Sequence, residues 1–341
     1  MWVADDNFVY SIIVFLCIPL APSLSSITNV LSFRQKRIIG GMNASIEERW
    51  AFAPSLKIIT IGEEEFGQCG ATIISKRHLL TAAHCIINLV NVAGNKDIKI
   101  IRDADYFLAD LRLINDIDDN NFHSYNVTNR TYIHHNYNYD KFTNDIAVVE
   151  YPEDFDFGIE PIRLAADFIE NEGEMAFAVG YGKYRPNDSE NLTHSYYLRE
   201  GVFVFREAEY CSQTWTRPNI DRKICSGEYG RGTALGDSGG PLMKNGDDGK
   251  WYQVGICSYG KRNSYYDRKT YPGISTRVSY YCPWIAKVTK GEVKCHPYER
   301  LTKSNVAEDL LFEKVFNMEN NAHLLTINKF VLIMISFTMI F

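Results

Sequence analysis

The stretch Gly236-Asp237-Ser238-Gly239-Gly240-Pro241 decides how the rest of the chain is interpreted. Glycines around a serine allow a tight turn that exposes the hydroxyl and lets backbone N–H groups converge on one point. This arrangement suits acyl transfer, in which the serine attacks a carbonyl and the N–H groups hold the resulting oxyanion. Because a serine hydroxyl is a weak nucleophile by itself, the turn predicts a histidine base elsewhere, oriented by a third group.

The composition of the 341-residue chain is that of a globular protein, with 45% hydrophobic residues, and a chain of this length can bury a sizeable core. The formal net charge of −6 gives no reason to expect a nucleic acid as a partner. We expect a globular protein that acts on something other than nucleic acid.

Residues 1–25 are typical of a signal peptide. An apolar run, Phe8–Ala21, is followed by small residues of the kind that a signal peptidase selects. No basic residue precedes the run, so an uncleaved membrane anchor is the alternative. The run is shorter than the roughly 20 residues that a spanning helix needs, which favours the signal peptide.

Residues 26–37 are polar and end in a basic cluster, which indicates an activation propeptide. Arg34-Gln35-Lys36-Arg37 stands directly before the apolar pair Ile38-Ile39, so cleavage after Arg37 would free the ammonium group of Ile38. A solvated basic patch is the alternative. Asp237 favours cleavage, because a buried carboxylate beside the serine needs a cationic partner such as this ammonium.

Short β-prone runs alternate with turns from Pro54 to Thr81, which indicates an all-β region. The last run leads into His84 and Cys85. A disulfide between Cys69 and Cys85 would close a loop of about fifteen residues, worth roughly 3 kcal/mol, and would fix the backbone beside His84. A lone histidine is more often a surface or core residue than a catalyst, so His84 is a candidate base because of its neighbours.

Three motifs, in this order, closely resemble the trypsin/chymotrypsin-like serine protease family: Leu79-Leu80-Thr81-Ala82-Ala83-His84-Cys85, Asn144-Asp145-Ile146-Ala147-Val148-Val149 and the glycine-rich serine turn. The resemblance covers residues 38–290. It implies an all-β fold of two packed antiparallel six-stranded β-barrels with a C-terminal helix, and an active site in the cleft between the barrels. It also implies a catalytic triad of His84, Asp145 and Ser238.

The resemblance assigns further roles around the triad. Asp145, which alone would be taken for a turn former, accepts the ring N–H of His84. Gly236 and Ser238 supply the backbone donors of the oxyanion hole. Ser258, in the predicted strand Val254–Ser258, matches the position whose backbone pairs with the substrate as an added strand.

The resemblance also places Gly232 at the bottom of the primary specificity pocket and Gly260 and Gly273 on its walls. Trypsin-like members carry an aspartate at the bottom. An uncharged, open pocket favours a large apolar or aromatic substrate side chain. Two features depart from this interpretation: Ala234 stands where the family usually has a pocket cysteine, and Arg231 would favour acidic substrates if its side chain entered the pocket.

The remaining cysteines are assigned in part. Cys211 and Cys225 match a second family disulfide. We expect Cys257 to be a buried free thiol. A bond between Cys282 and Cys295 matches no family pair and is left open.

Five Asn-x-Ser/Thr sequons, all in expected loops, predict N-glycosylation. They are Asn43, Asn126, Asn129, Asn187 and Asn191.

We expect no cofactor and no metal. An acidic insertion with Asp116, Asp118 and Asp119 lacks the spacing of a calcium loop, so a solvated loop is favoured over a calcium site. His134 and His135 are interpreted as loop residues, because no further ligand lies at metal-site spacing.

Residues 291–341 form an extension with an apolar tail, Phe330–Phe341. As a helix the tail would span about 18 Å against a hydrocarbon core of about 30 Å, so it cannot cross a bilayer unaided. Small residues before it resemble the attachment signal of a glycosylphosphatidylinositol (GPI) anchor. An uncleaved membrane-associated tail and no anchor at all are the alternatives.

The sequence therefore predicts a secreted or surface-tethered serine endopeptidase that is made as a zymogen and is not trypsin-like in specificity. Its expected partners are a protein or peptide substrate and an activating protease, convertase-like or trypsin-like, with a proteinaceous inhibitor as a further candidate. The alternative is a non-catalytic homologue that serves as a binding or regulatory module. Such homologues usually lose a triad residue, whereas this chain keeps all three.

Overall fold

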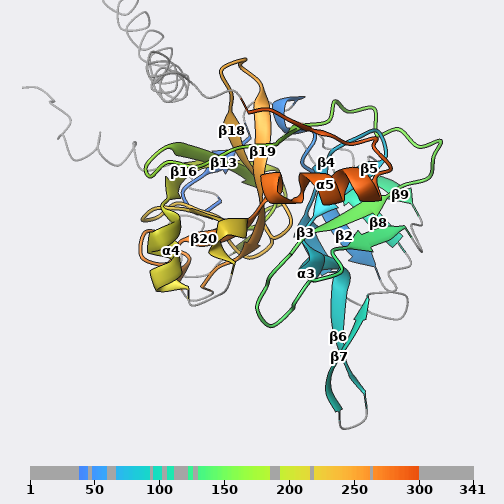
Figure 1. Ribbon diagram of the computed structural model, residues 1–341, viewed down its shortest axis with the longest axis horizontal. Coiled ribbons are helices and arrows are strands. Elements are labelled where there is room, and N and C mark those ends of the chain that lie inside the picture. Colours follow the sequence, from blue (N-terminus) through green and yellow to red (C-terminus); the bar gives the residue numbers. More distant parts are fainter. Residues whose placement is uncertain are drawn as a thin grey trace, which may run out of the picture.

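The computed structural model describes residues 38–44, 48–59, 67–92, 95–101, 106–110, 122–125, 130–184, 193–215, 219–261 and 264–298. In Figure 1 these residues form two groups of strands, one from each half of the chain, with a helix in front of them. The predicted signal peptide, Arg37, the acidic insertion and the apolar tail lie outside the described residues, as do the sequons at Asn126, Asn129, Asn187 and Asn191.

The second half of the chain forms a closed barrel of six antiparallel strands. Alternate residues of β16 are buried, among them Phe203 and Phe205, as expected for a strand with one face on a core. Around the ring the strands are β13 (Met175–Gly180), β16 (Arg199–Arg206), β17 (Lys223–Ser226), β20 (Gly273–Arg277), β19 (Trp251–Tyr259) and β18 (Pro241–Asn245). The pairing of β18 with β13 closes the ring.

The first half forms two four-stranded antiparallel sheets that share one hydrophobic core, which includes Leu56, Ile73, Leu80 and Val148. The fold is therefore of the predicted class, although the described strands of this half do not form one closed ring of six. One sheet is β10 (Thr131–Ile133), β11 (Ala147–Glu150), β5 (His78–Thr81) and β4 (Thr72–Ile73); the other is β3 (Gly67–Gly70), β2 (Ser55–Ile59), β8 (Tyr106–Asp110) and β9 (Phe122–Tyr125).

A two-stranded sheet of β6 (Ile87–Val92) and β7 (Asn95–Ile101) projects away from these sheets (Figure 1). This hairpin was not expected from the sequence. The other short elements are β1 (Met42–Asn43), η1 (Glu48–Trp50), β12 (Arg163–Ala165), β14 (Lys183–Tyr184), β15 (Thr193–His194), η2 (Ile220–Arg222) and β21 (Cys295–His296).

Asn43 lies in strand β1 and not in a loop, which corrects the expectation for this sequon. Its partner strand is β16, and its side-chain oxygen accepts a hydrogen bond from Arg199 Nη1 at 2.9 Å. The amide that a glycan would modify is therefore held by a neighbouring side chain.

Helix α5 (Val278–Val288) is the C-terminal helix that the resemblance implied. It buries Val278, Tyr281 and Ile285 in the core of the first half. The ring of His134 packs 5.4 Å from that of Tyr281, so this histidine has a packing role. None of the helices in the described ranges combines the length and the hydropathy that a bilayer-spanning segment requires.

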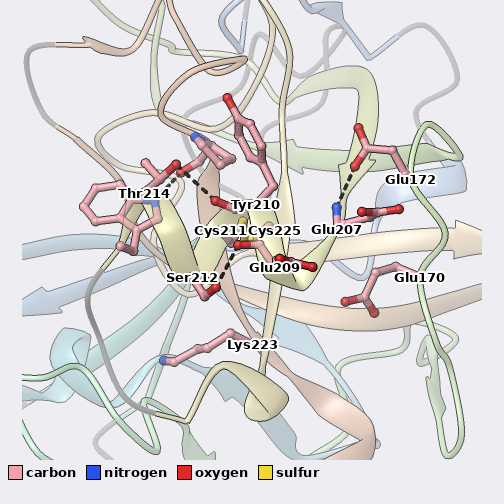
Figure 2. Close-up of a disulfide and its surroundings, with 12 residues drawn as sticks. Glu170, Glu172, Glu207, Glu209, Tyr210, Cys211, Ser212, Thr214, Lys223 and Cys225 are labelled. Atoms are coloured by element: carbon pink, nitrogen blue, oxygen red, sulfur yellow. Dashed lines mark hydrogen bonds between the residues drawn. A yellow bond between two sulfur atoms is a disulfide. The ribbon is translucent and has the colours of Figure 1, made fainter.

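Three disulfides brace these elements. Cys69–Cys85 joins β3 to helix α3 (Ala83–Ile86), and Cys282–Cys295, the pair left open by the sequence, joins α5 to β21. Cys211–Cys225 joins helix α4 (Ala208–Thr214) to β17 (Figure 2). Cys257 is buried and unbonded, as expected.

Candidate active site

The pairing of two strands places a carboxylate beside His84. Strand β5 runs antiparallel to β11 with Thr81 opposite Ala147. If this register is continued beyond both strands, Asp145 lies opposite Ala83, next to His84. The Cys69–Cys85 bond fixes the other neighbour of His84. Because both cysteines are oxidised, their sulfurs offer no thiolate ligand for a metal near this histidine.

Asp145 holds His84 through two hydrogen bonds. Its Oδ2 lies 2.8 Å from His84 Nδ1, and its Oδ1 accepts the His84 backbone N–H at 2.9 Å. The Ser258 hydroxyl donates to the same Oδ2. The Asp145 carboxylate is fully buried, whereas the His84 side chain is 17% exposed. The carboxylate can therefore fix the orientation of a ring whose other edge is accessible.

Asp145 is a buried acid whose pKa is nevertheless lowered. Burial alone would raise this pKa, because it penalises the charged form. The charge and hydrogen bond of His84, the charge of Lys223 and the hydrogen bond of Ser258 together outweigh burial. The ionised carboxylate is thus the stable form beside the imidazole.

The turn before Asp145 is fixed by Asn144, whose φ of 53° is in the left-handed region that asparagine tolerates. Its side-chain N–H donates to Asn136 O at 2.7 Å. Its side-chain oxygen accepts from the Tyr281 hydroxyl at 3.0 Å and from Arg222 Nη1 at 3.2 Å. Helix α5 therefore helps to position the Asp145 carboxylate.

The serine turn brings Ser238 to the cavity that His84 lines. This cavity has a volume of about 520 Å³, and its walls include His84, Gly236 and Ser238. Within the described part of the chain, no hydrogen bond joins Ser238 Oγ to His84 Nε2. Such catalytic hydrogen bonds are often long before substrate binds. The three predicted triad residues thus converge on one site, with the His–Asp pair already bonded.

Two backbone N–H groups of the serine turn are available to a substrate. Among the described residues, neither Gly236 N nor Ser238 N has an intramolecular acceptor. Gly236 adopts a φ of +98°, and a β-carbon there would lie 3.0 Å from Gly182 Cα, so only glycine fits this turn without strain. Both predicted oxyanion donors therefore border the cavity without competing partners.

The turn also anchors the two halves of the molecule to each other. Gly70 N donates to Ser238 O at 2.7 Å, and a β-carbon on Gly70 would lie 2.7 Å from Gly240 Cα. The Thr276 hydroxyl in the barrel donates to Asp145 O at 2.9 Å. Ser238 and Asp145 thus each contact the opposite half.

Asp237 is buried beside the nucleophile. Its oxygens accept the N–H groups of Gly182 at 3.0 Å and Ala234 at 2.8 Å. Burial raises the pKa of Asp237 to about 6, against the opposing effects of these N–H groups and the charges of Arg268 and Arg199. No cationic side chain in the described ranges forms an ion pair with this carboxylate.

Ile38, the predicted new N-terminus, is fully buried in the core of the barrel half. The next residue forms a β-bridge with Gly232, whose N–H donates to Ile39 O at 3.0 Å. The segment after the predicted cleavage point therefore lies against the loop that precedes the serine turn.

The specificity pocket differs from the uncharged, open pocket that the sequence predicted. Of the predicted pocket residues, Ser258 and Gly260 line the same cavity as Ser238, whereas Gly232 and Gly273 do not, and the side chain of Arg268 lies against Gly232 and Gly260. Arg268 is 2% exposed and lines the same cavity as Ser238. The cavity therefore carries a positive charge that the sequence-based interpretation of the pocket did not include.

Arg231, the arginine considered from the sequence, does not line this cavity. It lies 3.4 Å from Glu228 in an ion pair, and its side chain is 49% exposed. Sequence reasoning missed two further residues. Arg268 gave no signal, since it stands in a polar stretch that resembles a solvated loop. Phe142 packs 5.5 Å from the His84 ring, and its place shortly before the Asp145 motif was the only available signal.

Comparisons with known proteins identify the family of this chain. A family model described as Trypsin matches residues 38–285. Proclotting enzyme from Tachypleus tridentatus is 30% identical over 280 residues, which cover 79% of this chain and 70% of that protein. Trypsin, alkaline C from Manduca sexta is 29% identical over 265 residues, which cover 74% of this chain and 90% of that protein.

Transmembrane protease serine 7 from Homo sapiens is 30% identical over 259 residues, which cover 74% of this chain but 28% of that longer protein. The family match covers more than half of the chain, and the motifs that carry the resemblance all lie inside it. The chain therefore belongs to the trypsin/chymotrypsin-like family of serine proteases.

Proposed function

We propose that this chain is a serine endopeptidase that cleaves peptide bonds through His84, Asp145 and Ser238. One observation carries the proposal: the buried Asp145 carboxylate holds His84 Nδ1 at 2.8 Å in a cavity that Ser238 also lines. The cleft around these residues is large enough to accept a peptide segment. The names of the relatives, which include a trypsin and a transmembrane protease, support the same activity.

In the proposed reaction, His84 Nε2 takes the proton of Ser238 as Oγ attacks the peptide carbonyl. The N–H groups of Gly236 and Ser238 hold the oxyanion, and Asp145 stays ionised and stabilises the imidazolium. The imidazolium then gives its proton to the leaving amine. Water, deprotonated by His84, releases the acyl group from Ser238.

Activation by cleavage after Arg37 completes this machinery. The new ammonium group of Ile38 pairs with Asp237, which otherwise is a buried carboxylate with a pKa raised to about 6. The complete burial of Ile38 supports this step, as does the β-bridge of Ile39 to Gly232. The activating partner is a convertase-like or trypsin-like protease, and the protease domain spans residues 38–290.

The enzyme acts outside the cell or at its surface. Three disulfides support this location, because such bonds persist in oxidising compartments. The proposals for N-glycosylation and for a GPI signal in residues 291–341 rest on sequence patterns. Release of the protein from intact cells by a phosphatidylinositol-specific phospholipase C tests the anchor.

Labelling by a fluorophosphonate probe tests the catalytic proposal. We expect strong labelling of the processed protein and none of Ser238→Ala, because the probe reacts only with an activated serine. The unprocessed chain should label weakly. Equal labelling of the wild type and Ser238→Ala would instead favour the non-catalytic homologue.

A further inference from the structure

We propose that Arg268 makes this enzyme selective for an aspartate or glutamate side chain on the residue whose carbonyl Ser238 attacks. The inference rests on the proposed protease function and names the substrate class of the same site.

The guanidinium of Arg268 lies inside the specificity pocket. A β-carbon on Gly260 would lie 2.6 Å from Arg268 Nη1, and one on Gly232 would lie 2.8 Å from Arg268 Cγ. The arginine therefore occupies the space that these two glycines leave open. Because it lines the same cavity as His84 and Ser238, a substrate side chain that enters the pocket meets it.

The guanidinium keeps two N–H groups for a ligand. Nε and Nη2 each donate to Thr233 O, at 3.1 and 2.9 Å, and Nη1 donates to Tyr271 O at 3.3 Å. An arginine has five N–H donors, of which Nη1 and Nη2 each carry two. One N–H on each of these nitrogens has no acceptor among the described residues. A carboxylate can accept both in a bidentate pair.

The charge of Arg268 also lacks a direct counterion. No carboxylate in the described ranges lies within ion-pair distance, although the side chain is only 2% exposed. Burial lowers the pKa of Arg268 to about 10, so it stays protonated at neutral pH. The charge of Asp237 acts on it from a distance and is neutralised by Ile38 in the proposed mature form. The guanidinium lies over the ring of Tyr265, with Cζ 4.8 Å from the ring centroid. A buried charge without a counterion is still costly, and a substrate carboxylate offsets that cost.

Other substrate side chains fit this pocket less well. A large apolar side chain would strip the remaining water from the guanidinium and give it no acceptor. A lysine or arginine side chain would bring a like charge into the same buried space. A glutamine has the shape of glutamate but lacks its charge, which makes it the sharpest comparison.

Cleavage of two peptides that differ only by glutamate or glutamine at this position tests the inference. We expect kcat/KM to favour glutamate by about 10- to 100-fold, the range for a hydrogen bond to a charged group. Matched peptides with phenylalanine and arginine should be cleaved more slowly still. Equal cleavage of the glutamate and glutamine peptides, or a preference for phenylalanine or arginine, would overturn the inference.

Two variants separate the specific role of Arg268 from a general effect of removing an arginine. Arg268→Gln should abolish the preference for glutamate, whereas Arg231→Ala, outside the cavity, should keep it. Fluorophosphonate labelling of Arg268→Gln reports whether its catalytic centre is intact. If this variant does not fold, the wild-type comparison of glutamate and glutamine still decides the question.

Binding to Ser238→Ala distinguishes failure of the inference from failure of the proposed function. Fluorescence anisotropy measures the affinity of the labelled glutamate and glutamine peptides without turnover. Tighter binding of the glutamate peptide supports the charged pocket even if the wild type shows no probe labelling. Equal binding overturns the inference, while labelling of the wild type would leave the protease function standing.

Discussion

At the scale of single residues, Asp145 determines whether His84 can act as a base. A carboxylate that accepts the N–H at Nδ1 favours the tautomer in which Nε2 is the acceptor. Burial disfavours the ionised form of the Asp145 carboxylate. His84, Lys223 and the Ser258 hydroxyl outweigh this effect of burial and lower the pKa of Asp145. The partners of the acid therefore matter as much as the acid itself.

Asp145→Asn should lower kcat by about 10⁴-fold, because the amide N–H₂ can face Nδ1 and favour the wrong tautomer of His84. Steady-state cleavage of a peptide substrate measures this change. The control is Asp156→Asn, which neutralises an exposed aspartate paired with Lys76 at 2.9 Å. It should leave kcat unchanged. A similar loss in both variants would show that the effect of Asp145 is not specific to the site.

The convergence of His84, Asp145 and Ser238 on one site could be predicted from the sequence, whereas the position of Arg268 could not, and the reason is physical. His84, Asp145 and Ser238 lie in motifs whose neighbours carry information, namely a cysteine, a buried strand and paired glycines. Arg268 lies in an irregular loop between β19 and β20 and reaches the pocket through tertiary packing. The predicted pocket glycines indicated an open pocket, but spacing along the chain could not show that Arg268 packs against Gly232 and Gly260.

At the scale of elements, β-prone runs in the sequence were sufficient to predict some of the strands. The expected strand Val254–Ser258 lies inside β19, and β2, β3, β4 and β5 lie within the expected β-prone region Pro54–Thr81. Strand β1 and the β6–β7 hairpin were not predicted. Such short or isolated pairs depend on a partner strand that local sequence does not reveal.

Gly239 of the serine turn packs closely against the first half of the molecule. A substitution at Gly239 therefore tests how much this contact contributes to stability and to activity. Its φ is +80°, and a β-carbon would overlap the side-chain oxygen of Thr81 and Gly70 O. Gly239→Ala should lower the free energy of unfolding by about 2–5 kcal/mol and abolish labelling of Ser238. Urea unfolding measures the first effect and fluorophosphonate labelling the second.

Gly173→Ala is the matched control for Gly239→Ala. Gly173 has nearly the same φ, +82°, but a β-carbon there would meet no atom within 4 Å. In Gly173→Ala only backbone strain should lower the free energy of unfolding, by about 1–2 kcal/mol. The fluorophosphonate labelling of Ser238 should be unchanged. Equal losses of stability in the two variants would show that strain alone, and not the contact with the first half, explains the effect.

At the scale of the whole molecule, the site forms only where the two halves meet. His84 and Asp145 come from the first half, and Ser238 and Ser258 come from the barrel half. The Gly70–Ser238 and Thr276–Asp145 hydrogen bonds cross between them. We propose that activation acts on the barrel half alone, through the pairing of Ile38 with Asp237. It can therefore complete the serine turn without separating the two halves.

The burial of Asp237 predicts a pH dependence of the uncleaved chain, kept intact by Arg37→Gln. Its folded pKa of about 6 lies above the unfolded value of about 3.9. The stability from this group is therefore fully present below about pH 4 and is lost as the pH rises through about 6, by about 3 kcal/mol. Urea unfolding at about pH 4 and pH 7 measures it.

The matched variant, Asp237→Asn in the same Arg37→Gln background, lacks the titrating group, so its stability should fall less between these two pH values. All other titrating groups are common to both chains and cancel in the comparison. After cleavage of the wild type, the Ile38 ammonium should hold Asp237 ionised and remove the loss at pH 7. If both uncleaved chains lose the same stability as the pH rises, ionising the buried Asp237 carboxylate costs no measurable free energy. The Ile38 ammonium would then have no such cost to offset, which would contradict the proposed activation.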